Sequence, residues 1–162
     1  MKFFLFFAGT HWALMGAGTA FIGGAIGSSM GITYAANVGS GVLAEDPDKF
    51  GRILPIVAMP GTQGIYGFIT AFLVWTFFLR DPKLLADPTV GFQVFLACMP
   101  VAFACLVSAI FQGLTGTGAA SLIGKRPEAG GRAIILPALV ETYAVLSLII
   151  SMLFLLNIKG QV

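Results

Sequence analysis

The chain alternates long apolar segments with short polar breaks. Formal charges are absent from residues 3–44, 53–79 and 88–124, and residues 133–158 carry only Glu141. A membrane-spanning helix needs about 20 predominantly apolar residues, and each of these segments exceeds that length. The pattern therefore predicts an all-α membrane protein with four transmembrane helices.

The polar breaks have the sequences EDPDKFGR, RDPKLLADPT and KRPEAGGR, at residues 45–52, 80–89 and 125–132. Each break contains proline and two contain glycine, which is typical of turns between helices. The predicted architecture is two tandem helical hairpins. Residues 1–80 form the first hairpin, 81–89 the connecting loop, and 90–162 the second hairpin.

The two hairpins resemble copies of one unit. A shift of 80 residues aligns matching positions of the two halves: Pro47 with Pro127, Asp48 with Glu128, Gly51 with Gly131, Arg52 with Arg132, Thr62 with Thr142 and Ser28 with Ser108. The same shift places Gly61 opposite Glu141, so only the second copy carries the carboxylate. Tandem hairpins have the same orientation in the membrane, which makes this a parallel repeat.

Small and bulky residues are divided between the segments. Gly23, Gly27 and Gly31 form GxxxGxxxG in the first segment, a spacing that lets helix backbones approach closely. The third segment has a similar stripe at Ala104, Ser108, Gln112, Gly116 and Ala120. The second and fourth segments carry bulky side chains: Phe68, Phe72, Trp75, Phe77, Phe78 and Phe154. We therefore expect the first and third helices to form the interior, and the second and fourth to face lipid or a partner.

The first and third helices are also expected to be longer than a bilayer is thick. Thirty-odd residues at 1.5 Å each span about 50 Å, against a hydrocarbon core of about 30 Å. These two helices should therefore extend beyond the membrane toward the breaks at 45–52 and 125–132. The two sides of the membrane carry five and four positive residues, and this difference does not select an orientation.

Composition supports a membrane protein and excludes other classes. Charged residues make up 10% of the chain, against about 25% in soluble domains, and a net charge of +2 is too small to indicate nucleic acid. Cys98 and Cys105 are interpreted as small apolar core residues, and His11 as an interfacial side chain. Lys2 and the following FFLFFAG resemble the start of a signal peptide, but no small-x-small site follows, so we expect this segment to be retained.

Several polar residues are predicted to lie at similar depth near the middle of the membrane. Counted from the first and third polar breaks, Glu141, Gln63 and Gln112 lie about 13, 16 and 20 Å along their helices. Thr62 adjoins Gln63, and Tyr66 follows them at a helical spacing that places it on the same face. A cluster of oxygen-bearing side chains is therefore expected around the glutamate.

The buried glutamate needs a physical explanation. A charged side chain at the centre of a bilayer costs on the order of 3 kcal/mol, and the apolar segments offer no Lys or Arg to pair with Glu141. Its carboxyl is therefore either protonated or bound to a cation. One carboxylate with neutral oxygens from Thr62, Gln63 and Gln112 suits a monovalent cation such as Na⁺, because divalent ions usually recruit more carboxylates. Pro60 disturbs the helix just before these residues, which is tolerated at this depth where backbone lines a site.

Three motifs on this duplicated hairpin identify a family. PGTQGIYGF (60–68), FQG (111–113) and VETYA (140–144) closely resemble the membrane rotor subunit of V-type (A/V-type) ATPases, the proteolipid called subunit K in bacterial enzymes. The resemblance covers essentially the whole chain. It implies a multi-pass protein of the bacterial cell membrane that forms a closed ring of identical subunits within membrane lipids. The ring would turn against a stator subunit with an arginine, and loops 45–52 and 125–132 would face the cytoplasm and touch the central stalk.

The resemblance also implies a set of ion ligands. In the sodium-coupled members the ion is held by four side chains and one backbone carbonyl, which match Thr62, Gln63, Gln112 and Glu141, and the carbonyl of Met59. The tyrosine that matches Tyr66 hydrogen-bonds the glutamate and locks the site. ATP hydrolysis or synthesis would occur in other subunits, so neither a catalytic site nor an organic cofactor is expected in this chain.

Three alternatives remain open from the sequence. The ring could carry protons, with Gln63 and Gln112 serving only as hydrogen-bond partners of Glu141. The chain could instead be a small autonomous transporter or channel built from the parallel repeat, in which case more polar residues should line a path. A purely structural four-helix membrane protein would leave Glu141 unexplained.

Overall fold

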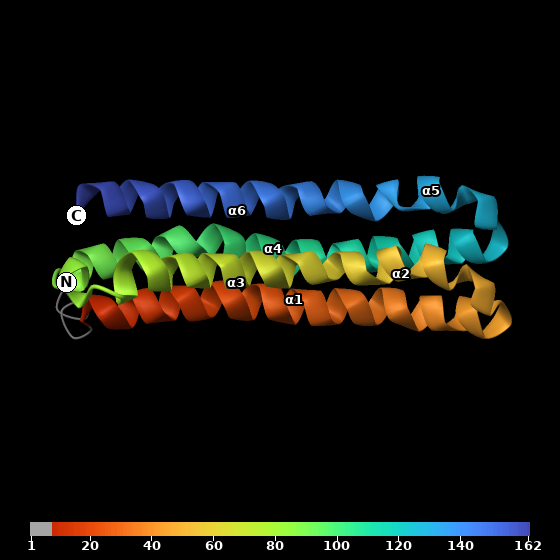
Figure 1. Ribbon diagram of the computed structural model, residues 1–162, viewed down its shortest axis with the longest axis horizontal. Helices are drawn as coiled ribbons and strands as arrows, with labels where there is room; N and C mark the ends of the chain where they lie inside the picture. Colours follow the sequence, from red (N-terminus) through yellow and green to blue (C-terminus); the bar gives the residue numbers. More distant parts are fainter. Residues whose placement is uncertain (1–7) are drawn as a thin grey trace.

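The computed structural model describes residues 8–162 as four long helical spans that lie side by side (Figure 1). The first and third spans are single helices, α1 (Gly9–Glu45) and α4 (Pro88–Lys125). The second runs through α2 (Phe50–Ala58), η3 (Met59–Gly61), α3 (Thr62–Val74) and η4 (Trp75–Leu79), and the fourth through α5 (Gly130–Ala133) and α6 (Ile135–Gln161). The predicted all-α class with two tandem hairpins is confirmed; the expectation about the signal-like segment lies outside the described residues.

Short 3₁₀ turns join the spans where the sequence has its polar breaks. These are η2 (Pro47–Lys49), η5 (Pro82–Leu85) and η6 (Pro127–Ala129). An aspartate precedes the proline that starts η2, η5 and α4, and its side chain accepts a hydrogen bond from a backbone N–H two residues on. Such a cap followed by proline favours the start of a helix. At α4 the Thr89 N–H donates to Asp87 at 2.8 Å, which lowers the pKa of that carboxyl.

The inner pair of helices packs through small residues, as expected. α1 contacts α4 more extensively than any other element. A Cβ added at Gly27 would lie only 2.6 Å from the Leu106 carbonyl oxygen, so the two backbones are in direct contact there. Cys98 and Cys105 are buried and free, in agreement with their interpretation as small core residues.

The expected division between interior and surface is correct for only part of the molecule. Phe68, Phe72 and Trp75 are exposed, but Phe78, expected on the surface, is completely buried in the core. α1 and α4 in turn each expose a row of large apolar side chains away from their mutual contact, including Ile26 and Phe103. Only one face of each inner helix is therefore interior to the chain.

The expectation that the first and third helices are longer than the bilayer is thick applies to the second and fourth spans as well. Counted with η2 in the second span and η6 in the fourth, all four spans are long and apolar enough to cross a membrane, with 37, 33, 38 and 35 residues. At 1.5 Å per residue, even the 33-residue span reaches about 50 Å. The second and fourth spans are therefore only slightly shorter than the first and third, because the turns η2 and η6 continue them to the polar breaks.

Candidate functional site

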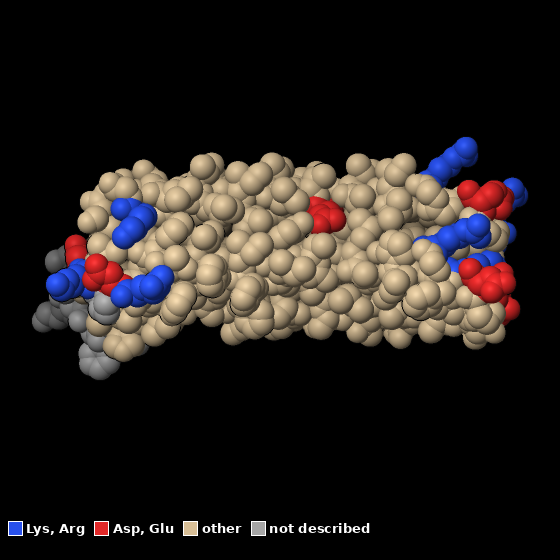
Figure 2. Space-filling model, viewed as in Figure 1, with Lys and Arg blue, Asp and Glu red and all other residues tan. Residues whose placement is uncertain are grey.

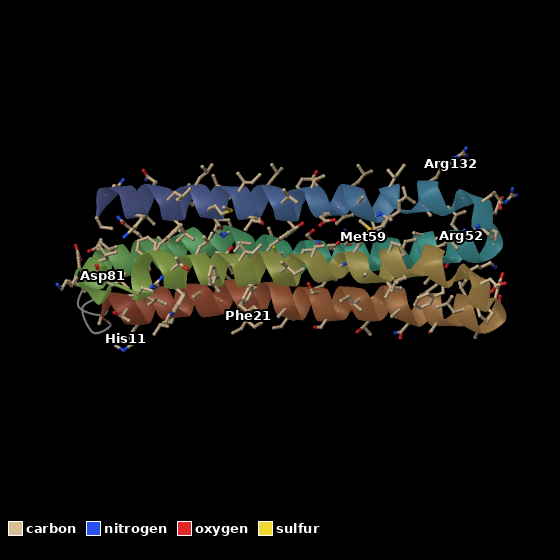
Figure 3. All side chains as sticks on the ribbon, viewed as in Figure 1. His11, Phe21, Arg52, Met59, Asp81 and Arg132 are labelled. Carbon is tan, nitrogen blue, oxygen red and sulfur yellow. The ribbon has the colours of Figure 1, made fainter. Side chains whose placement is uncertain are left out.

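Glu141 lies midway along the bundle, far from the other charges. Figure 2 shows basic and acidic residues gathered at the two ends of the molecule, with one acidic side chain halfway along the face in view. The ends are marked in Figure 3 by Arg52 and Arg132 on one side and by His11 and Asp81 on the other. His11 is exposed near its end, as expected for an interfacial side chain.

The carboxylate of Glu141 is held by side chains from two other helices. The Tyr66 hydroxyl on α3 donates to Oε1 at 2.7 Å, and the Gln112 amide on α4 donates through Nε2 to Oε2 at 3.4 Å. Glu141 itself projects from α6 and is half-buried. The structure therefore brings together, in one site, residues that are 29 and 75 positions apart in the chain.

Two fully buried glutamines form the inner wall of the site. Gln63 Nε2 donates to Gln112 Oε1 at 2.7 Å, and Gln112 Nε2 also donates to the Pro137 carbonyl at 3.1 Å. A buried amide left without partners costs about 1–3 kcal/mol, so these bonds hold both side chains in place. The glutamines therefore connect all three helices that surround Glu141.

The remaining oxygens come from the break between α2 and α3, where Figure 3 labels Met59. Residues Met59–Gly61 form a 3₁₀ turn, and the Met59 carbonyl accepts both the backbone N–H and the hydroxyl of Thr62, the latter at 2.9 Å. The Thr62 hydroxyl also lies 3.3 Å from Gln63 Oε1. Pro60 removes the N–H that would bond Ile56, and the tightened turn then redirects the Met59 carbonyl from its i+4 partner to Thr62. The kink thus gathers three oxygens on one turn.

Two serines join the site without having been proposed as part of it. Ser108 donates to the Val140 carbonyl at 3.0 Å and lies 3.5 Å from Gln63 Nε2. Its repeat counterpart Ser28 accepts the backbone N–H of Gly64 at 2.8 Å. Ser108 lies one helical turn before Gln112 on α4, and the stripe of residues spaced by four that contains both was the sequence signal for it. These serines attach each inner helix to its outer helix.

The site is rich in oxygen and poor in formal charge. Within residues 8–162 no group of three or more His, Cys, Asp or Glu side chains is placed to hold a metal ion. One carboxylate, two amides, a hydroxyl and a turn carbonyl provide a single negative charge and several neutral oxygens. Such a donor set can neutralise one monovalent cation or one proton, and is a poor match for transition metals.

Comparisons with known proteins agree with these features. Residues 15–74 and 95–154 each match the family of the ATP synthase C subunits, and the second match lies 80 residues after the first. The chain is 36% identical over 149 residues to the V-type sodium ATPase subunit K of Enterococcus hirae, covering 92% of this chain and 93% of that protein. It is 34% identical over 160 residues to the A-type ATP synthase subunit K of Methanocaldococcus jannaschii, covering 96% of this chain and 68% of that protein.

Proposed function

The chain belongs to the family of ATP synthase C subunits and is a membrane rotor subunit of a V-type (A/V-type) ATPase; on this premise we propose that it carries Na⁺ bound at Glu141. The resemblance drawn from the three sequence motifs is thereby confirmed, and so is the duplicated hairpin. The proposal of Na⁺ is supported by the oxygen cluster around Glu141 and by the similarity to a protein named as a sodium ATPase subunit. The observation that carries it is a connected set of polar groups around a lone carboxylate: Tyr66 and Gln112 bond Glu141, and Gln63, Thr62 and the Met59 carbonyl continue the chain of hydrogen bonds from Gln112.

We assign the ion ligands as the carboxylate of Glu141, the side-chain oxygens of Thr62, Gln63 and Gln112, and the carbonyl of Met59. The hydrogen-bond pattern indicates how these side chains would have to reorient when Na⁺ binds. Gln112 directs its NH₂ group at Glu141 and its oxygen at Gln63, so ligation requires the Gln112 amide to turn over. Gln63 Nε2 would then lose its acceptor, Gln112 Oε1, so the Gln63 amide would have to reorient as well. Ion binding therefore replaces a set of amide hydrogen bonds with coordination at the same place.

Tyr66 closes the proposed site. Its hydroxyl donates 2.7 Å to Glu141 Oε1, and a hydrogen bond to a charged group contributes about 1.5–3 kcal/mol. This bond keeps the carboxylate turned inward while the ion is carried. Release requires the bond to break, which a positive charge on the stator subunit would favour by attracting the carboxylate.

The electrical logic of transport follows from charge neutrality. A site that holds Glu141 and Na⁺ has no net charge and can face lipid, whereas an empty, ionised site cannot do so cheaply. Moving one elementary charge across about 100 mV involves about 2.3 kcal/mol. The ring would therefore turn through lipid only with its sites loaded. The free energy needed to move each Na⁺ across the membrane is small enough for ATP hydrolysis in other subunits to supply.

A proton-carrying ring is the second candidate. It is favoured by the short bond from Gln63 Nε2 to Gln112 Oε1 at 2.7 Å, in which the two amides serve as hydrogen-bond partners of each other. In that case Glu141 would carry a proton, and the glutamines would serve only to hold the carboxyl in place. The two candidates share Glu141 and Tyr66 and differ in whether the amide oxygens touch the cargo.

The assembly completes the proposal. The chain would form a closed ring of identical subunits in the bacterial cell membrane, with loops 45–52 and 125–132 toward the cytoplasm and the central stalk. A stator subunit with an arginine would face Glu141 as it passes. The chain would contribute no catalytic site or organic cofactor, and ATP would be hydrolysed or made elsewhere in the complex.

Labelling with a hydrophobic carbodiimide tests the choice of ion. Membranes that contain the complex are treated in NaCl or in choline chloride, each at a series of fixed pH values, and modification of Glu141 is followed by mass spectrometry. The sodium proposal predicts that NaCl slows labelling at constant pH. Labelling that is indifferent to NaCl but is suppressed by raising the pH would contradict it and support the proton-carrying ring.

A further inference from the structure

The two ends of the Gln63 amide face different parts of the site. Its Oε1 lies 3.3 Å from the Thr62 hydroxyl, which in turn donates to the Met59 carbonyl at 2.9 Å. Its Nε2 points the other way and donates to Gln112 Oε1 at 2.7 Å. Because Gln63 is completely buried, both ends of its amide depend on partners from the protein.

Ser108 holds a second acceptor next to the same amide. Its hydroxyl donates to the Val140 carbonyl at 3.0 Å, so its single hydrogen is used and its oxygen can only accept from other groups. Gln63 Nε2 lies 3.5 Å from that oxygen, a distance at which a hydrogen bond contributes little. Ser108 is only 5% exposed, so water has little access to this oxygen. In this arrangement the Ser108 oxygen is held beside the Gln63 amide and is hardly used.

Ligation of Na⁺ by Gln112 removes the acceptor that Gln63 uses now. The oxygen and the NH₂ group of an amide turn together, so when Gln112 Oε1 turns toward Glu141 its Nε2 turns toward Gln63. Two N–H donors then oppose each other, and Gln63 Nε2 has to leave this contact. A buried N–H without an acceptor is costly, and among the hydrogen bonds of the described residues the other acceptor of Gln63 Nε2 is Ser108 Oγ.

We propose that Ser108 is a positioning residue for Na⁺: its oxygen receives Gln63 Nε2 when the ion is bound, and this bond fixes Gln63 Oε1 as a ligand. The inference rests on the proposed function and adds to it a residue outside the ligand set. Because the amide is planar, a bond from Nε2 to Ser108 keeps Oε1 directed toward Thr62, where it already lies. A proton on Glu141 needs no oxygen from Gln63. Ser108 therefore favours Na⁺ over H⁺ as the cargo of the site.

The repeat counterpart of Ser108 is bonded in the opposite sense. Ser28 accepts the backbone N–H of Gly64 at 2.8 Å, a bond that joins α1 to α3 and involves no ligand side chain. Ser108 instead donates to a backbone carbonyl, which directs its hydrogen away from Gln63 and leaves its oxygen beside the amide. The serine that can accept from a ligand side chain thus lies in the second hairpin, together with the carboxylate.

Carbodiimide labelling of Glu141 in membranes that contain the complex tests this role. Ser108→Ala removes the acceptor, and Ser108→Cys keeps a side chain of similar shape that accepts only weakly. Ser147→Ala is the matched control, because Ser147 is also buried, at 6% exposure, and its hydroxyl donates to the Ala144 carbonyl within α6. Two quantities are measured for each variant: the NaCl concentration that halves the labelling rate at fixed pH, and the pH dependence of labelling in choline chloride without Na⁺.

Ser108→Ala is expected to raise the half-protecting NaCl concentration about three- to tenfold, the worth of one neutral hydrogen bond. Ser108→Cys should raise it by a smaller factor and Ser147→Ala should leave it unchanged. The pH dependence without Na⁺ should be the same in all four proteins, because Ser108 acts only when the ion is bound. A general loosening of the site would instead shift both quantities.

The outcomes separate this inference from the proposed function. A half-protecting NaCl concentration that is unchanged in Ser108→Ala, or a pH profile that shifts as far as the NaCl dependence does, would overturn the positioning role and leave the proposed function standing. If the Ser108→Ala ring does not assemble, Ser108→Cys decides by the same two measurements. If NaCl does not protect Glu141 in the wild type, the proposed function fails and this inference fails with it.

Discussion

Removing the Tyr66 hydroxyl is the sharpest test of how Glu141 is held. The substitution Tyr66→Phe keeps the ring and nearly all of the volume, and it deletes the donor that lies 2.7 Å from Glu141 Oε1. A hydrogen bond to a charged group contributes about 1.5–3 kcal/mol, and about 1.4 kcal/mol corresponds to tenfold in affinity. When the site opens to water, solvent replaces this bond; in the closed, loaded site nothing does. We therefore expect Na⁺ to bind roughly 10- to 100-fold more weakly and to exchange faster.

The assay is equilibrium binding and exchange of radioactive Na⁺ on the purified ring. Tyr34→Phe is the matched control, because it removes the same hydroxyl from a tyrosine of α1 that has no contact with Glu141 among the described hydrogen bonds. Tyr34→Phe is expected to leave both quantities unchanged. Equal affinity and exchange in Tyr66→Phe and the wild type would refute the role of Tyr66 as the group that closes the site.

Three further predictions concern the ligands and the helix contact. Thr62→Val should weaken Na⁺ binding about fivefold, the worth of about 1 kcal/mol, whereas Thr142→Val at the repeat counterpart should not; equal effects on isotope binding would count against Thr62 as a ligand. Gln63→Leu leaves Gln112 Oε1 without its 2.7 Å donor, so the ring should lose both Na⁺ affinity and resistance to heating in detergent. A variant ring as heat-resistant as the wild type would contradict the stabilising role of the buried Gln63–Gln112 hydrogen bond. Gly27→Ala should lower the temperature at which the ring dissociates, because its Cβ would lie 2.6 Å from a backbone oxygen; Gly18→Ala, with nothing within 4 Å, is the control, and identical melting of the two variants would refute the close contact.

The sequence predicted the four spans and the membership of the site because both depend on simple counting. Charge-free segments define the spans, and the number of residues from each polar break to Glu141, Gln63 and Gln112 defines a common depth. The structure brings these residues together with Thr62 and Tyr66, as the depth estimate requires. The assignment of these residues as ion ligands stays a prediction.

The sequence did not predict which apolar side chains are buried between helices and which face outward. In lipid, interior and exterior side chains are equally apolar, so hydropathy did not distinguish buried Phe78 from exposed Phe72. The same ambiguity concealed the exposed row of apolar side chains on α4 that includes Phe103. The role of Ser108 was also missed, because a membrane serine usually bonds within its own helix, whereas this one reaches the Val140 carbonyl of α6.

The most direct test of the account is the number of sodium ions that the purified ring binds, measured with radioactive Na⁺ for the wild type and for Glu141→Gln. The account predicts one saturable Na⁺ per chain in the wild type, since only the second hairpin has the carboxylate, and no saturable binding in Glu141→Gln with the ring intact. Saturable binding that survives Glu141→Gln, or its absence from an intact wild-type ring, would contradict the claim that Glu141 carries Na⁺.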